Sequence, residues 1–174
     1  GLAAERAGAD IHEGTRVTGI EKAGNSPTND GIRFKVKTER GDIATKEIML
    51  ATNAWIGNIV PQFRQRVMPA ESFVIATEPL PNELAQRLIP NNRMVYDTRK
   101  TLAYYRLSPD NRMVWGGELT FAGVSAKTNI NTLRNGMLKI FPELSKDNID
   151  YFWNGTLGMT LDENAHAGQI DGMW

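Results

Sequence analysis

The sequence predicts an α+β fold, in which a mixed, largely antiparallel sheet carries helices on one face and is accompanied by a small β-meander. Two patterns predict the strands. Apolar Ile32, Phe34 and Val36 alternate with basic residues, and three short strand-like segments follow one another between residues 94 and 118. Apolar residues at helical spacing from 130 to 141 predict a helix. At 174 residues, the chain can hold one domain, or one domain with part of another.

The chain opens with a short helix and a first strand. Residues 1–8 are rich in helix formers, but no capping residue precedes them. We therefore expect residue 1 to be a cut made inside a longer protein. A strand is expected over residues 11–20, with Val17 and Ile20 buried.

The meander is completed by two more strands. The alternating strand over residues 32–37 turns at 39–42, and the returning strand runs from Ile43 into the apolar run 48–51. An unbroken apolar run is typical of a strand covered on both faces. Its end at residues 52–55 is rich in small side chains, and open α/β sheets place their ligands at such strand ends.

The second half of the chain predicts most of the larger sheet. A strand is expected over 71–78 and a helix over 82–89, followed by strands at 94–97, 102–107 and 113–118 that form a meander. The later helix is expected to be capped by Thr128 or Asn129 and to end before Pro142.

Residues 151–170 follow neither a helical nor an alternating period. The segment opens with three aromatic residues and contains Gly155, Gly158 and Gly168. Glycine among apolar residues indicates that another strand or a flat ligand approaches the backbone closely.

Composition excludes several classes of function. Twenty basic and twenty acidic residues give a net charge of zero, so neither nucleic acid nor a membrane surface is an expected partner. Cysteine is absent from the sequence, which agrees with a reducing compartment, and we expect a cytoplasmic protein. No run of about 20 apolar residues predicts a membrane span. Neither His12 nor His166 has a partner at ligand spacing, so no metal site is expected.

The remaining candidates for chemistry are aromatic. The adjacent Asp162 and Glu163 are interpreted as a solvated surface pair rather than as an acid and a base. The aromatic candidates lie on predicted strands or at their ends: Tyr104, Tyr105, Trp115, Tyr151, Phe152 and Trp153. Such residues commonly fill a core. A face of Tyr and Trp also suits an amine substrate, because aromatic rings attract cations.

Three motifs occur in order along the chain. They are Ala-Thr-Asn-Ala-Trp at 51–55, Tyr-Tyr-Arg-Leu-Ser-Pro-Asp-Asn-Arg-Met-Val-Trp-Gly-Gly at 104–117, and Trp-Asn-Gly-Thr-Leu-Gly-Met-Thr-Leu-Asp at 153–162. In this order and spacing, the chain resembles the FAD-dependent oxidoreductases related to D-amino acid oxidase (the DAO family), and most closely their gamma-glutamylputrescine oxidase-like branch. The resemblance covers nearly the whole chain.

The resemblance implies a middle portion of such an enzyme. Family members bind FAD through a glycine-rich βαβ unit near the amino terminus and a second glycine-rich segment near the carboxyl terminus, and this sequence contains neither. Residues 1–60 would belong to the FAD-binding domain, including its meander. Residues 61–174 would form the substrate-binding domain, with a return toward the FAD domain at the end. The chain alone is then expected to be inactive, to bind FAD weakly or not at all, and to self-associate.

The resemblance also implies roles for individual residues. FAD would be contacted by Val17, Thr52, Asn53, Trp55, Gly158, Met159 and Thr160. The substrate would be contacted by Tyr104, Tyr105, Trp115 and Leu157. No side chain is expected to act as a catalytic nucleophile, because the cofactor carries the electron chemistry.

Two departures from the family pattern bear on the substrate and the oxidant. Amino-acid oxidases of this group clamp the substrate carboxylate with an arginine where this sequence has Thr156, Leu157 and Gly158. We therefore expect a primary or secondary amine of the gamma-glutamylputrescine type, oxidised to an imine by hydride transfer to flavin. Related sarcosine oxidases use a lysine near the flavin for reaction with oxygen, and this sequence has Trp115 or Gly116 there, so the electron acceptor stays open. The alternatives are activity of the D-amino acid or glycine oxidase or dehydrogenase type, and a non-catalytic binding or assembly module.

Overall fold

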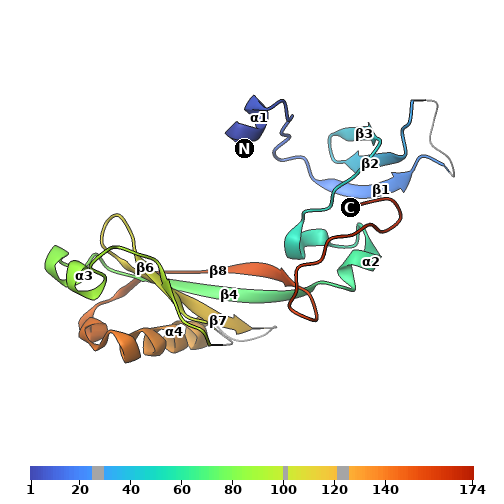
Figure 1. Cartoon of the computed structure of the whole chain (residues 1–174). Helices are drawn as coiled ribbons and strands as arrows, with labels where there is room; N and C mark the ends of the chain where they lie inside the picture. Colours follow the sequence, from blue (N-terminus) through green and yellow to red (C-terminus); the bar gives the residue numbers. More distant parts are fainter. Residues whose placement is uncertain (25–29, 100–101, 121–125) are drawn as a thin grey trace. The chain divides into compact units, whose positions relative to one another are not determined.

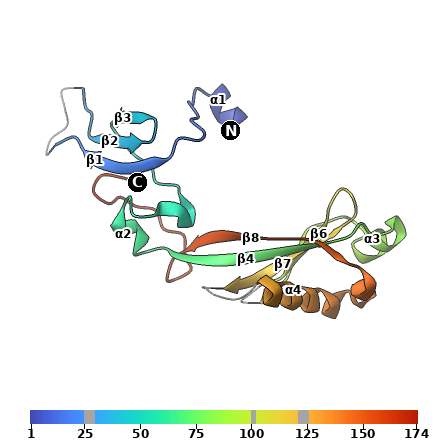
Figure 2. The same cartoon turned by 180° about the vertical axis from the view of Figure 1, so that it is seen from behind.

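The computed structural model describes residues 1–24, 30–99, 102–120 and 126–174, which divide into two compact units. We call residues Gly1–Val67 with Thr160–Trp174 the split unit, and residues Met68–Met159 the central unit. Figures 1 and 2 show the elements of each unit from opposite sides. Every ladder between the described strands is antiparallel, which confirms the predicted α+β fold.

The split unit is built around the predicted meander. Its elements, in chain order, are α1 (Leu2–Arg6), β1 (Val17–Lys22), β2 (Phe34–Thr38), β3 (Gly41–Thr45), the 3-10 helix η1 (Asn53–Ile56) and α2 (Pro61–Arg64). Among the described residues, β1, β2 and β3 form a sheet in that order. Its small core joins Phe34 of β2 to Ile56, Val60 and Met173, so the end of the chain packs against the meander.

Two predictions for the split unit are wrong in part. The strand expected over 11–20 begins only at Val17, and both Val17 and Ile20 are half-buried. The apolar run 48–51 lies outside the strands, and Met49 is 80% exposed. The backbone of this run instead bonds to the last residue: the Leu50 N–H donates to the Trp174 carbonyl at 2.6 Å. The run predicted a strand covered on both faces, whereas only Ile48 and Leu50 are partly buried, against the small core.

The central unit contains the larger sheet. Its elements, in chain order, are β4 (Met68–Thr77), α3 (Asn82–Leu88), β5 (Val95–Tyr96), β6 (Tyr104–Leu107), β7 (Met113–Thr120), α4 (Ala126–Ile140), the 3-10 helix η2 (Pro142–Lys146) and β8 (Ile149–Met159). In the part of the chain that the structure describes, the strand order is β5-β6-β7-β4-β8. The meander β5-β6-β7 and the helix α3 confirm the predictions for this region.

Helix α4 packs along one face of this sheet, against β4 and β7 (Figure 1). The core between them contains Ile75, Trp115, Leu133 and Met137, each at most 2% exposed. The helix ends at Ile140, as expected from Pro142. The predicted caps are wrong, because the helix already begins at Ala126 and therefore includes Thr128 and Asn129.

The segment without a period contains a long strand. Strand β8 pairs with β4 along almost its full length, from Ile149 opposite Thr77 to Met159 opposite Met68. It is an edge strand among the described strands, so burial does not impose a clean alternation on its side chains. This explains why its hydrophobic pattern predicts no strand.

Candidate functional site

The larger sheet has two chemically different faces. One face packs against α4, and its residues belong to the core. We call the opposite face, turned away from α4, the open face. Because successive residues of a strand point to opposite faces, neighbours in the sequence are divided between the two.

Tyr105 and Trp115 lie on the face that packs against α4. They are directly opposite each other on β6 and β7, and their rings stack with centroids 4.7 Å apart. Trp115 is 1% exposed, and the ring of Phe141 packs edge-on against both of them. Tyr105 and Trp115 therefore pack in the core, as aromatic residues on strands commonly do, and neither lines the open face.

Tyr104 lies on the open face. It begins a row of cross-strand partners that runs from Tyr104 to Gly116, from Gly116 to Val74, and from Val74 to Trp153. Directly paired residues share a face, so the row places Tyr104 and Trp153 on the same side of the sheet with smaller residues between them. Tyr104 is half-buried, and Trp153 is 46% exposed.

Leu157 also belongs to the open face. It stands on β8 opposite Ala70, two positions along β4 from Ser72 and four from Val74, and it is 43% exposed. Of the predicted substrate-binding set, Tyr104 and Leu157 therefore lie on the open face. Sequence reasoning missed Ser72 as a site residue, although Ser72 and Val74 alternate with the apolar core residues Phe73 and Ile75 and could have indicated an open face.

The residues expected to contact FAD are accessible in their respective units. In the split unit, Thr52, Asn53 and Trp55 are exposed around η1, and Trp55 is 73% exposed. Val17 at the start of β1 and Thr160 are half-buried. In the central unit, Gly158 is exposed and Met159 is half-buried. Neither described core cluster includes any of the seven.

The segment after β8 is organised by Asp162. The Asn164 backbone N–H donates to the Asp162 carboxylate at 3.2 Å, and His166 Nε2 lies 2.9 Å from the same oxygen. The hydrogen bond from the Asn164 backbone, with further contacts from the Asn164 side chain and His166, lowers the pKa of Asp162 from 3.8 to about 2. The expectation that His166 lacks a partner is therefore wrong. All of these side chains are exposed, as a solvated turn requires.

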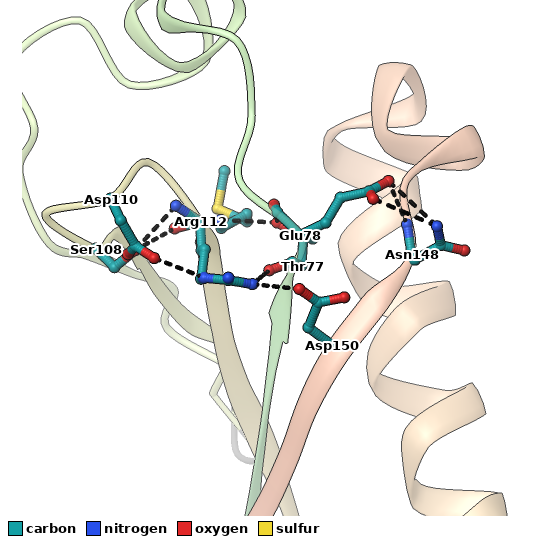
Figure 3. Close-up of polar contacts among 8 residues, drawn as sticks. Thr77, Glu78, Ser108, Asp110, Arg112, Asn148 and Asp150 are labelled. Atoms are coloured by element: carbon teal, nitrogen blue, oxygen red, sulfur yellow. Dashed lines mark hydrogen bonds and ion pairs between the residues drawn. The ribbon is translucent and has the colours of Figure 1, made fainter.

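In the central unit, a polar cluster joins the ends of three strands (Figure 3). Arg112 binds Asp110 at 2.7 Å and Asp150 at 2.5 Å, and it donates to the Thr77 carbonyl at 2.9 Å. Its guanidinium also lies 4.9 Å from the centre of the Tyr151 ring. The carboxylate of Asp150, followed by that of Asp110, raises the pKa of Arg112. The cluster ties the ends of β4, β7 and β8 together.

Within residues 1–24, 30–99, 102–120 and 126–174, no group of three His, Cys, Asp or Glu side chains could hold a metal ion. None of the helices described in the structure has the length and apolar character needed to cross a membrane.

Comparison with known proteins identifies a family that matches the whole chain and relatives that match parts of it. The family model described as "FAD dependent oxidoreductase" (DAO) matches residues 1–174. Gamma-glutamylputrescine oxidoreductase of Escherichia coli is 42% identical over 72 residues, which are 41% of this chain and 17% of that protein. "Probable oxidoreductase OrdL" of Haemophilus influenzae is 36% identical over 97 residues, which are 51% of this chain and 22% of that protein.

Solved structures share the fold. The L-proline dehydrogenase from P. horikoshii superimposes with a TM-score of 0.75 at 23% identity, over 98% of this chain and 45% of that one. The glycine oxidase from Geobacillus kaustophilus gives a TM-score of 0.72 at 20% identity, over 98% of this chain and 44% of that one. The chain thus spans less than a quarter of these curated relatives and less than half of these solved chains.

Proposed function

The chain belongs to the DAO family of FAD-dependent oxidoreductases, and from this premise we propose that it is part of an enzyme that oxidises a primary or secondary amine. The substrate that we propose resembles gamma-glutamylputrescine. The open face is the surface that would receive it.

The observation that carries this proposal is the pair of aromatic side chains on the open face. Tyr104 and Trp153 lie in one cross-strand row, with only Gly116 and Val74 between them. Aromatic ring faces attract an ammonium group, and the attraction is stronger when water is excluded. Residues 156–158 are Thr, Leu and Gly, so this stretch of β8 provides no guanidinium to clamp a carboxylate next to the amine.

We propose that FAD is held by the residues that the family resemblance implies. They are Val17, Thr52, Asn53, Trp55, Gly158, Met159 and Thr160. Gly158 has no side chain to stand between the backbone of β8 and a ring system, and it lies on the exposed edge strand. When held by these residues, FAD would supply the acceptor for the two electrons that leave the amine as it is oxidised to an imine.

The domain roles follow from the same reasoning. We propose that residues 1–60 belong to an FAD-binding domain, and that residues 61–174 form a substrate-binding domain with a terminal return toward it. Absent cysteine supports a cytoplasmic location for the enzyme. The 174 residues alone are expected to bind FAD weakly, so a purified sample that holds flavin tightly would contradict this assignment.

Substrate oxidation is tested on the longer protein encoded by the same reading frame, loaded with FAD. Flavin reduction is followed under anaerobic conditions with gamma-glutamylputrescine, putrescine, glycine and D-amino acids, so that the result does not depend on the natural electron acceptor. We expect gamma-glutamylputrescine to reduce the flavin fast. Reduction by amino acids alone would overturn the amine proposal, and no reduction by any of them would favour a non-catalytic module.

An amino-acid substrate is the second candidate, and one observation favours it. Arg106 is exposed on the open face two residues beyond Tyr104, and its Nε donates to the Leu107 carbonyl at 3.2 Å. A guanidinium on the same face could bind a carboxylate. Arg106→Gln would then raise the KM for an amino acid much more than the KM for a simple amine.

A further inference from the structure

The Tyr104 side chain crosses the sheet instead of pointing straight away from it. Its hydroxyl lies 3.2 Å from Ser72 Oγ, yet Tyr104 is on β6 and Ser72 is on β4. Strand β7 runs between these two strands. The phenol ring therefore spans β7 to reach its partner.

Gly116 of β7 is the residue beneath this ring. A Cβ built on Gly116 would lie 2.1 Å from Cε2 of Tyr104, 2.3 Å from its Cζ and 2.6 Å from its hydroxyl oxygen. Real Cβ atoms essentially never approach so closely, so any side chain at this position would displace the ring. The φ of Gly116 is outside the left-handed region that favours glycine. Space for the ring, and not backbone conformation, therefore requires the glycine.

We propose that Ser72 and Gly116 are positioning residues that hold the Tyr104 ring flat across β7. Gly116 provides the flat surface, and the Ser72 hydroxyl fixes the far end of the ring. The face of the ring turned away from Gly116 is then presented to an amine, which is the orientation in which an aromatic ring attracts a cation. The inference rests on the proposed function, since it assigns to Ser72 and Gly116 the orientation of a substrate-binding tyrosine.

The first experiment measures ring position in the 174-residue chain, without cofactor or substrate. The four tyrosines are labelled with 3-fluorotyrosine, and their fluorine resonances are assigned by single Tyr→Phe substitutions. Ser72→Ala is expected to shift or broaden the Tyr104 resonance, and Gly116→Ala is expected to shift it further. Gly155→Ala is the matched control, because Gly155 pairs with Ser72 on the same face but has no atom within 4 Å of an added Cβ.

The second experiment measures turnover in the full-length, FAD-loaded enzyme. Loss of one hydrogen bond that orients a binding residue is expected to raise the KM for the amine about three- to tenfold in Ser72→Ala, with little change in kcat. Ser72→Thr retains a hydroxyl and is expected to restore most of the affinity. In a Tyr104→Phe background, Ser72→Ala is expected to add less than about a twofold change, because its effect passes through the phenol.

The outcomes separate the positioning of Tyr104 from the proposed function. An unchanged Tyr104 resonance in Ser72→Ala, or an equal change in Gly155→Ala, would overturn the positioning role even if Gly116→Ala fails to fold. Additive effects of Ser72→Ala and Tyr104→Phe on KM would also overturn it. If the resonance responds but the enzyme oxidises no amine, the ring contact stands and its role in amine binding is refuted.

Discussion

Trp115 and Trp153 show how strand alternation gives one residue type two roles. Both belong to the central unit, but Trp115 is 1% exposed beneath α4, whereas Trp153 is 46% exposed on the open face. The same alternation separates Tyr104 from Tyr105, which a period of two could have predicted from the sequence alone. The aromatic composition predicted a group of candidates, but not which of them would be covered by helix α4.

This difference predicts that two similar substitutions lower the stability by unequal amounts. Trp115→Ala removes a ring packed against Tyr105 and Phe141 and is expected to lower the free energy of unfolding by about 3–5 kcal/mol. Trp153→Ala removes only cross-strand contacts on an edge strand and is expected to cost less than about 1 kcal/mol. Urea denaturation followed by circular dichroism measures both. Equal losses of stability would contradict the division of the sheet into a core face and an open face.

The Asp162 carboxylate predicts a pH dependence in the segment after β8. Its pKa is lowered from 3.8 to about 2, so the contacts that favour the carboxylate are fully present above about pH 4 and are lost as the pH falls toward 2. Titration of the Asp162 side-chain carbon by NMR should show a midpoint near 2. In Asn164→Ala the midpoint should rise toward 3.8, because the side-chain hydrogen bond of Asn164 is lost. An unchanged midpoint in that variant would rule out its contribution.

At the scale of elements, the clearest predictions came from strands and helices that have one face covered by the core. Apolar residues alternate with polar ones along β2 and recur at helical spacing in α3, as expected for elements with one covered face. Strand β8 lies at a sheet edge, and residues 48–51 are held by the last residue of the chain, so local pattern could not predict either arrangement. Of the candidate site, the aromatic β6 was found, but Ser72 was missed because its importance comes only from pairing across the sheet.

Arg112 should control how firmly the start of β8 is held. Its guanidinium joins Asp110, Asp150 and the Thr77 carbonyl, so Arg112→Ala is expected to speed amide hydrogen exchange at the beginning of β8 more than in α4. Arg112→Lys should have an intermediate effect, since it keeps the charge but loses the planar fork.

A surface ion pair in the same unit provides the control for Arg112. Arg87 lies 3.8 Å from Glu143, and both side chains are largely exposed. Arg87→Ala should leave the exchange rates of β8 unchanged, because exposed pairs contribute little. If Arg87→Ala and Arg112→Ala accelerate exchange equally, the cluster in Figure 3 has no special role in holding β8.

At the scale of the whole molecule, the exposed edge of β8 predicts self-association of the 174-residue chain. The strand is eleven residues long and contains neither lysine nor proline, which are the residues that usually protect an edge from pairing. We expect association that increases with concentration, measured by sedimentation velocity. Asn154→Lys should weaken it by placing a charge on the edge, whereas Gln86→Lys on α3 adds the same charge elsewhere and should not. A sample that stays monomeric at high concentration would contradict this prediction.

The pairing of Met68 with Met159 has a consequence for how such enzymes can change. These two residues are the first and the last of the central unit, and they stand opposite each other in one ladder. The chain therefore enters and leaves the central unit at adjacent positions, as it does in an inserted domain. An exchange of residues 68–159 for those of a relative would join the two chains at two positions that face each other in the β4-β8 ladder. Such an exchange would test whether the substrate preference that we propose for the open face moves with the central unit.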